Sequence, residues 1–193
     1  MPNPLDCRIV LASKSPRRSQ LLEQAGFQFI IRSTDTNEDF DPAMPALEVS
    51  EHLAVRKAGA ARPFLSEGDV ILAADSLVLQ GDIIYEKPKD KADAQRMLRA
   101  ISGTVHTVTT GVCLLSAKEQ RRFTGISQVH VAAMSEAEID FYIEQYQPYD
   151  KAGGYGIQEW VGLCKIHRID GTYPNIMGLP VDLVYHHLSQ MAW

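Results

Sequence analysis

The sequence predicts an α/β protein, and three stretches of the chain carry this prediction. A short apolar run at 7–12 leads into an amphipathic segment that ends at Gly26, which is the pattern of a strand followed by a helix. The nearly unbroken apolar run 69–79 has the composition of a strand buried on both faces. The β-rich runs 105–115 and 123–133 are joined by a charged turn, which indicates a large antiparallel hairpin. With 193 residues and 45% hydrophobic content, the chain can bury the core of one large domain or of two lobes that share a sheet.

Composition and charge exclude several classes of protein. The formal net charge of -5 argues against non-specific binding to nucleic acid, which requires a basic surface. The N-terminus lacks a signal-peptide pattern, and no apolar run approaches the ~20 residues of a membrane span. Cys7, Cys113 and Cys164 form no CxxC pair and lie in apolar runs, so we expect buried free thiols rather than disulfides or a zinc site. We therefore expect a soluble, cytoplasmic protein with no membrane or nucleic-acid partner.

The first strand-to-helix turn has the chemistry of an anion site. Ser15 is a good N-cap, and Pro16 fits the first helical position, where a missing N–H has no consequence. Backbone N–H groups and the positive end of the helix dipole gather at such a turn. The hydroxyl and basic side chains that surround it belong to Ser13, Lys14, Arg17 and Arg18. A phosphate site and a merely solvated basic helix start are both compatible with this pattern.

Two segments of mixed polarity follow the first helix. Residues 27–31 form a predicted second strand, which runs into an acidic loop at 35–41. Clustered carboxylates suit a hard divalent cation, although an acidic loop is more often just solvated. A helix is predicted from Pro45 to Arg62, and its Lys57 is either a solvated surface lysine or part of a site.

Asp75 interrupts the buried run 69–79. A buried carboxylate is unfavourable by several kcal/mol unless it is paired, hydrogen-bonded or bound to a metal. Structural pairing would satisfy this requirement. We favour a catalytic or metal-binding role, because open α/β sheets place their chemistry at the ends of interior strands.

The next segment is predicted to continue the sheet and then form a helix. A tight turn at 80–82 would return the chain through a strand at 83–85. Asp90 can cap a helix that ends at Gly103. His106, in the strand that follows, is expected to be half-buried.

The C-terminal third alternates helices, turns and one strand. A capping box predicts a helix over 136–145. The glycine-rich loop 150–158 could admit a flat ligand beside Tyr155 and Gln158, or could be a plain turn. A strand at 163–169, a turn at 171–175 and a helix that starts at Pro180 complete the predicted elements.

Taken together, seven segments of the chain resemble, in order, the motifs of the Maf family of nucleoside triphosphate pyrophosphatases. The segments are Leu11-Ala12-Ser13-Lys14-Ser15-Pro16-Arg17-Arg18, Leu53-Ala54-Val55-Arg56-Lys57-Ala58, Ala74-Asp75-Ser76, Glu86-Lys87-Pro88, Ser102-Gly103, Asp150-Lys151-Ala152-Gly153-Gly154-Tyr155-Gly156-Ile157-Gln158 and Asn175-Ile176-Met177-Gly178-Leu179-Pro180. The likeness spans nearly the whole chain, and seven ordered motifs are far more specific than any one of them.

The resemblance implies an α/β fold of the Maf and ITPase type. A mixed, elongated sheet flanked by helices would form two lobes with a substrate cleft between them, all within a single Maf-like domain over residues 1–193. The implied reaction cleaves a nucleoside triphosphate to the monophosphate and pyrophosphate, with a divalent cation, Mg²⁺ or Mn²⁺, as cofactor. A homodimer is compatible with the resemblance and is left open by the sequence.

The resemblance also implies roles for particular residues. Asp75 would be the proton acceptor, either by deprotonating the attacking water or by holding the metal while another carboxylate is the base. Glu38 would assist at the metal, although Asp35, Asp39 or Asp41 could serve in its place. The residues implied to hold phosphate oxygens are Ser13, Arg17, Arg18, Lys57 and Lys87.

Three positions bear on base preference. Arg17, Ser76 and Gln158 match the subgroup that prefers dTTP and UTP, whereas the subgroup acting on 7-methyl-GTP differs at all three. Ser76 stands where Thr is more frequent and Gly154 where Ala is more frequent, which weakens the inference about the base. Modified pyrimidine triphosphates share the mechanism and stay open as substrates. The alternative from another class is a non-catalytic nucleotide-binding regulator of cell division or septum formation.

Overall fold

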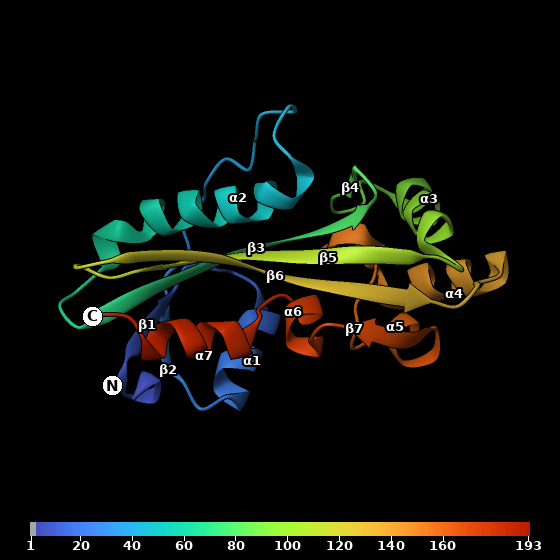
Figure 1. Cartoon of the computed structure of the whole chain (residues 1–193). Coiled ribbons are helices and arrows are strands. Elements are labelled where there is room, and N and C mark those ends of the chain that lie inside the picture. Colours follow the sequence, from blue (N-terminus) through green and yellow to red (C-terminus); the bar gives the residue numbers. More distant parts are fainter. Residues whose placement is uncertain (1–2) are drawn as a thin grey trace. The chain divides into compact units, whose positions relative to one another are not determined.

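The computed structural model describes residues 3–193, and its centre is a seven-stranded mixed sheet with the strand order β2-β1-β3-β5-β6-β7 and β4 paired to β3 (Figure 1). The strands are β1 (Arg8–Leu11), β2 (Gln28–Ile31), β3 (Asp69–Gln80), β4 (Ile83–Tyr85), β5 (Val105–Leu115), β6 (Gln120–Val131) and β7 (Ile166–Asp170). β1 runs parallel to β2 and β3, whereas β4 and β7 run antiparallel to their partners. The predicted α/β class with a mixed sheet is confirmed.

Helices flank the sheet. The α-helices are α1 (Pro16–Gln24), α2 (Ala46–Ala61), α3 (Lys91–Ile101), α4 (Glu136–Tyr146), α5 (Trp160–Cys164), α6 (Tyr173–Met177) and α7 (Val181–Ser189), and the 3-10 turns are η1 (Pro4–Asp6), η2 (Arg62–Phe64) and η3 (Ala152–Gly154). None of the helices within residues 3–193 is long and apolar enough to cross a membrane.

The chain divides into two compact units. The described part of unit 1 comprises residues 3–75, 110–125 and 178–193, and unit 2 comprises residues 76–109 and 126–177. The chain passes between the units within β3 (75/76), β5 (109/110) and β6 (125/126), so each of these strands contributes residues to both units. That the whole chain acts as a single domain stays a prediction.

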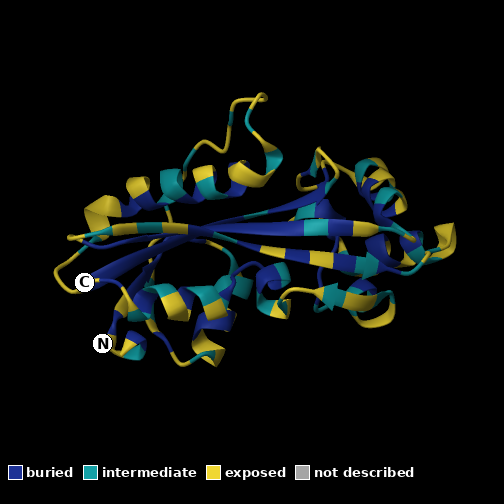
Figure 2. Ribbon diagram, in the orientation of Figure 1, coloured by how far each residue is buried: buried dark blue, intermediate teal, exposed yellow. Residues whose placement is uncertain are grey.

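In unit 1, α2 lies on one side of β1 and β3, while α1 and α7 lie on the other (Figure 1). Ala54, Ala58 and Ala61 share the buried face of α2 because they recur at helical spacing, and they pack with strand residues such as Val10 and Ile71. Figure 2 shows the result as a helix with a buried inner face and an exposed outer face. Small side chains on this face let α2 approach the sheet closely.

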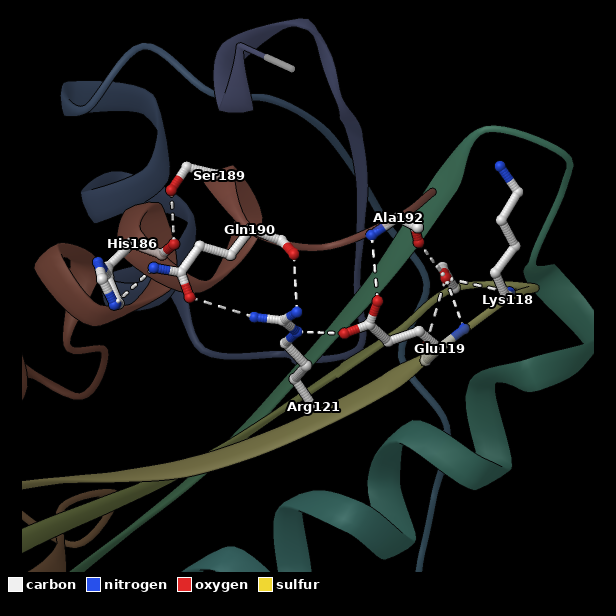
Figure 3. Close-up of polar contacts among 8 residues, drawn as sticks. Lys118, Glu119, Arg121, His186, Ser189, Gln190 and Ala192 are labelled. Carbon is white, nitrogen blue, oxygen red and sulfur yellow. Dashed lines mark hydrogen bonds and ion pairs between the residues drawn. The ribbon is translucent and has the colours of Figure 1, made fainter. Parts of the chain in front are cut away.

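The C-terminal residues of unit 1 are tied to the β5–β6 turn by polar contacts (Figure 3). Arg121 pairs with Glu119 and donates from Nη2 to the carbonyl of Gln190 at 2.7 Å. Ser116 Oγ donates to the carbonyl of Ala192 at 2.8 Å. The bounds of β6 correct the predicted hairpin: the strand runs from Gln120 to Val131 and not over 123–133, so Arg121 lies in the strand rather than in the turn.

Unit 2 is built around α3 and α4. Residues of both helices share one core with strand residues that include Val108 and Val129. The predicted caps are present, since Asp90 accepts a hydrogen bond from the Asp93 N–H at 2.8 Å and Ser135 forms a capping box with Glu138.

The segment before β7 differs from its prediction. The predicted strand over 163–169 is in fact the end of α5 followed by β7. Gly162 permits this helical turn, because a Cβ there would lie 1.7 Å from the carbonyl oxygen of Ile157. Cys164, at the end of α5, is exposed and not buried as expected, while Cys7 and Cys113 are buried free thiols as predicted.

The predicted turn at 171–175 contains the start of α6. Asn175 accounts for this difference, because its buried side chain donates to Ser127 Oγ at 2.8 Å and to the carbonyl of Val108 at 3.3 Å. These contacts hold the short helix against β5 and β6 within unit 2.

Candidate functional site

The turn between β1 and α1 presents helix N–H groups as the sequence predicts. The Ala12 N–H bonds to the carbonyl of Leu72 at 2.9 Å, which extends the sheet to the edge of the turn. Ser15 occupies the N-cap position and Pro16 the first helical position, but the Ser15 side chain makes no capping hydrogen bond. The N-terminus of α1 is therefore without a side-chain cap, as suits a helix end that receives an anion.

Ser13 and Arg18 are held together in this turn. Ser13 is buried, and its Oγ accepts the Ser15 N–H at 3.1 Å and Arg18 Nη1 at 3.2 Å. Because the oxygen accepts both bonds, the hydroxyl can still donate its proton to a further acceptor. Arg18 also donates from Nε to the carbonyl of Gly178 at 2.8 Å. Burial lowers the pKa of Arg18, and the nearby negative charge of Asp75 opposes that effect.

Lys57 joins the buried carboxylate to the acidic loop. Its Nζ forms ion pairs with Asp75 Oδ1 and, at 2.7 Å, with Glu38 Oε1. The Asp75 and Lys57 side chains are 12% and 15% exposed, whereas the Glu38 side chain is 53% exposed. The structure thus places Lys57 in the site and not on the open surface, and it gives Asp75 the partner that a buried carboxylate requires.

The other carboxylates of the acidic loop have different partners. Lys14 Nζ lies 2.6 Å from Asp35 Oδ1, and this hydrogen bond lowers the pKa of the exposed Asp35 carboxyl. Asp39 accepts from Asn37 Nδ2 at 2.5 Å, and Asp41 accepts the N–H of Ala43 at 2.9 Å. Glu38 is thus the loop residue that pairs with the lysine of the site.

Unit 1 brings together six of the residues singled out from the sequence: Ser13, Arg17, Arg18, Glu38, Lys57 and Asp75. Direct bonds link Arg18 to Ser13 and Lys57 to both carboxylates, and the charges of Asp75, Arg17 and Glu38 all act on Arg18. Ser76, Lys87 and Gln158 belong to unit 2.

In unit 2, the glycine-rich loop lies beside the Glu86-Lys87-Pro88 segment. The Gly153 N–H bonds to the carbonyl of Glu86 at 3.1 Å. Gly154 has a φ of 71°, and a Cβ there would lie 3.2 Å from Cγ of Pro88. Glycine suits both requirements at this position, which gives a local reason for its presence. Lys87 is exposed, and it is the next residue after Glu86, whose carbonyl accepts the bond from Gly153.

Gln158 carries an unsatisfied group. Its side-chain Oε1 is buried, and no hydrogen-bond partner for it exists among residues 3–193. A buried amide oxygen without a partner is unfavourable by about 1–3 kcal/mol, so this atom calls for a partner such as a water molecule or a ligand group.

Tyr155 is held from inside unit 2. Its hydroxyl lies 2.8 Å from Nε2 of His106, and the two rings meet edge to face. His106 is 1% exposed and therefore fully buried, not half-buried as predicted, because the ring lies beneath the glycine-rich loop. Burial lowers the pKa of His106 to about 4, so the imidazole is neutral at pH 7.

Sequence reasoning missed the polar residues that support this loop. Tyr142 on α4 accepts the Gly156 N–H at 2.9 Å and bonds to Glu159, which in turn pairs with Lys151 at 3.1 Å. The sequence did offer a signal for Glu159, because this charged residue directly follows Gln158. Tyr142 gave none, because an apolar-facing tyrosine on an amphipathic helix is ordinarily part of the core.

Within residues 3–193, no group of three or more His, Cys, Asp or Glu side chains is arranged to hold a metal ion. The carboxylates that share Lys57 are those of Glu38 and Asp75. Magnesium commonly binds one or two protein carboxylates and completes its shell with water and substrate phosphates. The oxygen donors of this pair therefore fit a divalent cation that binds together with a phosphate ligand.

Comparison with known proteins adds an independent line of observation. The family model described as Maf-like protein matches residues 8–191. A dTTP/UTP pyrophosphatase of Porphyromonas gingivalis is 43% identical over 188 residues, which cover 96% of this chain and 94% of that protein. A dTTP/UTP pyrophosphatase of Bacteroides thetaiotaomicron is 38% identical over 185 residues, which cover 95% and 96% of the two chains. The solved structure of the Staphylococcus aureus Ham1 protein has a TM-score of 0.48 and 18% identity, covering 65% of this chain and 72% of that one.

Proposed function

This chain belongs to the Maf family, and from that premise we propose that it is a nucleoside triphosphate pyrophosphatase that hydrolyses dTTP and UTP to the monophosphate and pyrophosphate. The observation that carries the proposal is the buried Asp75, ion-paired to Lys57 on the same unit as the uncapped N-terminus of α1. A protein that only bound nucleotides would need the basic groups but not a buried carboxylate among them.

The phosphate-binding part of the proposal rests on charge. A triphosphate carries about four negative charges near neutral pH, and surrounding cations lower its repulsion toward an attacking water. In our proposal the groups that hold phosphate oxygens are Ser13, Arg17, Arg18, Lys57, Lys87 and the N-terminus of α1. The two hydrogen bonds that the Ser13 oxygen accepts support this assignment, because its hydroxyl can then donate to a phosphate oxygen.

The proposed proton acceptor is Asp75. The ammonium of Lys57 pairs with one oxygen of Asp75, and a carboxylate can orient a water molecule and take its proton as the phosphoanhydride bond breaks. The water oxygen forms a bond to the phosphorus atom that it attacks, the phosphoanhydride bond between the monophosphate and the pyrophosphate breaks, and the pyrophosphate leaves the basic groups. Partial burial of Asp75 limits competing water around the carboxylate.

The proposal includes a divalent cation, Mg²⁺ or Mn²⁺. Glu38 and Asp75 would hold it, because these two carboxylates share Lys57 and supply the hard oxygen ligands that such ions prefer. When bound, the cation would neutralise phosphate charge. All other steps are assigned to the side chains of this chain.

For base selection we propose Gln158, with Ser76 and Arg17 as further specificity positions. The unpaired, buried Oε1 of Gln158 supports this choice, because uracil and thymine present an N3–H donor whereas cytosine presents an unprotonated N3. The side-chain amide of Gln158 can at the same time donate to a neighbouring carbonyl of the base.

The setting of the enzyme is part of the same proposal. We assign it to the cytoplasm, where nucleoside triphosphates are abundant and free thiols such as Cys7 and Cys113 stay reduced. Modified pyrimidine triphosphates extend the proposed substrate class, since they require the same phosphate groups.

Pyrophosphate release from purified protein tests the proposal. The protein is incubated with UTP, dTTP, CTP, GTP or 7-methyl-GTP, each with and without Mg²⁺ or Mn²⁺. We expect cation-dependent release that is fastest with UTP and dTTP. Nucleotide binding without hydrolysis of any triphosphate would overturn the proposal and favour the cell-division regulator instead.

A further inference from the structure

A buried polar bridge crosses unit 2 beneath the segment that carries Gln158. The hydroxyl of Tyr142, a fully buried side chain, accepts the Gly156 N–H at 2.9 Å and donates to Glu159 Oε2. The other oxygen of Glu159 lies 3.1 Å from Nζ of Lys151. Burial and the neighbouring carboxylate raise the pKa of Tyr142, so its hydroxyl stays protonated and acts as a donor to Glu159 at neutral pH.

The bridge requires close packing around Gly156. A Cβ at this position would lie 2.8 Å from Cδ of Glu159 and 2.9 Å from its Oε2. The glycine therefore leaves the space that the carboxylate occupies. Lys151 is also buried, with 8% exposure, and its ammonium pairs additionally with Asp150 at 2.6 Å.

Burying an ammonium, a carboxylate and a phenol together gives little net stability compared with apolar packing. Such an arrangement instead favours one geometry, because each group has specific directions for its hydrogen bonds. Here both ends of a short segment are fixed: Gly156 by its N–H and Glu159 by its carboxylate. Gln158 lies between these two fixed points.

We propose that Tyr142, Glu159 and Lys151 are positioning residues that set the orientation of Gln158 and thereby the selectivity for uracil and thymine. None of the three needs to touch the substrate. This inference rests on the proposed function and adds to it the device that fixes the specificity residue.

The side chain of Gln158 must be held in place because its terminal amide has both an acceptor and a donor. A glutamine that can rotate presents either its oxygen or its NH₂ to the base, so it accepts the N3–H of uracil or donates to the bare N3 of cytosine with equal ease. Discrimination therefore requires that the Gln158 side chain be held at one place beside the base, and the backbone that carries Gln158 sets this place. A displacement of about 0.5–1 Å is enough to loosen such a site.

The test compares UTP with CTP in variants of the full-length protein. Tyr142→Phe removes only the hydroxyl, and Glu159→Gln keeps the shape but removes the charge that faces Lys151. We expect the ratio of kcat/KM for UTP over CTP to fall about 10-fold in both variants, as expected for the loss of one well-placed hydrogen bond. Lys151→Arg retains the positive charge, and we expect it to keep most of the parental ratio.

Tyr146→Phe is the matched control. Tyr146 lies on the same helix and stacks on Tyr142 with ring centroids 5.0 Å apart, but it is not part of the bridge. This variant should keep the parental ratio. Thermal unfolding of every variant separates a change in selectivity from a loss of fold, because a merely structural role lowers Tm and the rates on both substrates together.

The outcomes are distinguishable. If the parent hydrolyses UTP and both bridge variants keep the UTP to CTP ratio, the positioning role is refuted and the proposed function stands. If a bridge variant does not fold, the remaining variant decides by the same ratio. If both fail to fold, Lys151→Met, which removes the ammonium that faces Glu159 Oε1, decides by the same ratio, and a parental ratio in that variant overturns the inference. If the parent hydrolyses no triphosphate, the proposed function fails and the inference fails with it.

Discussion

The sharpest test of the proposed chemistry is Asp75→Asn, because this change keeps the size of the side chain and removes its charge. Asparagine cannot take a proton from water near neutral pH. Loss of a general base commonly lowers the rate by about 10²–10⁴-fold. We therefore expect kcat for UTP to fall by about that factor while the variant stays folded.

The effect on stability follows from the contacts of Lys57. Removing one partner of a fully buried ion pair destabilises by about 3–5 kcal/mol. The Lys57 side chain is 15% exposed and keeps Glu38 as a partner at 2.7 Å, and the Oδ1 of asparagine can still accept a bond from it. The expected loss is therefore about 1–2 kcal/mol, which corresponds to a fall in Tm of about 2–8 °C.

Asp69→Asn is the matched control. Asp69 begins the same strand, is 3% exposed, and accepts bonds from Nε and Nη2 of Arg8 at 2.8 and 2.7 Å. We expect a comparable fall in Tm but near-parental turnover. Steady-state pyrophosphate release and thermal unfolding, measured on both variants, show whether the loss of turnover is specific to Asp75. Turnover of Asp75→Asn within about threefold of the parent would refute the assignment of the proton acceptor.

Three further predictions concern charge, base selection and pH. Arg17→Ala and Lys87→Ala should lower turnover by a factor that grows as salt is lowered, because unscreened phosphate charge then matters most; a factor independent of salt would contradict a phosphate role for these residues. Gln158→Glu should reduce kcat/KM for UTP with little change in Tm, because a carboxylate cannot donate to a carbonyl of the base; unchanged UTP kinetics would exclude this residue from base selection. The pKa of His106 is about 4 in the folded state, below its usual 6.5. Between these two pH values the unfolded state binds more protons than the folded state. The free energy of unfolding therefore decreases as the pH falls from 6.5 to 4, by up to about 3 kcal/mol. Denaturant unfolding at pH 7 and pH 4.5 should show a smaller loss for His106→Gln than for the parent, and equal losses would contradict the buried neutral imidazole.

The fold was largely predictable where local chemistry decides the structure. The caps at Asp90 and Ser135 and the tight turn before β4 depend on a few adjacent residues, and each is present as predicted. The predictions failed where distant residues decide. The short α6 exists because Asn175 bonds to Ser127, which lies far away in the sequence. No pattern within residues 171–175 carries that information.

In the candidate site, too, some features depend on adjacent residues and others on residues far apart in the sequence. The turn around Ser13 and the buried Asp75 could be singled out from residue type and neighbours alone, and the ordered motifs supplied their combination. Residue chemistry alone could not decide which acidic residue of 35–41 accompanies Asp75, because every carboxylate in the loop has the same chemistry; the family resemblance pointed to Glu38 but left Asp35, Asp39 and Asp41 open. Only the placement of Lys57 on α2 distinguishes Glu38 from the others.

Lys57 also shows why charge pairing and catalysis are not alternatives in this site. Its ammonium has three N–H donors, of which one goes to Asp75 and one to Glu38. The third donor can go to a phosphate oxygen of the proposed substrate. One side chain can then pair with the proposed proton acceptor, hold the acidic loop near it and neutralise charge on the triphosphate. A purely structural ion pair needs only one of these contacts, so the observed arrangement, with two carboxylates on one buried lysine, is better explained by the chemistry than by stability.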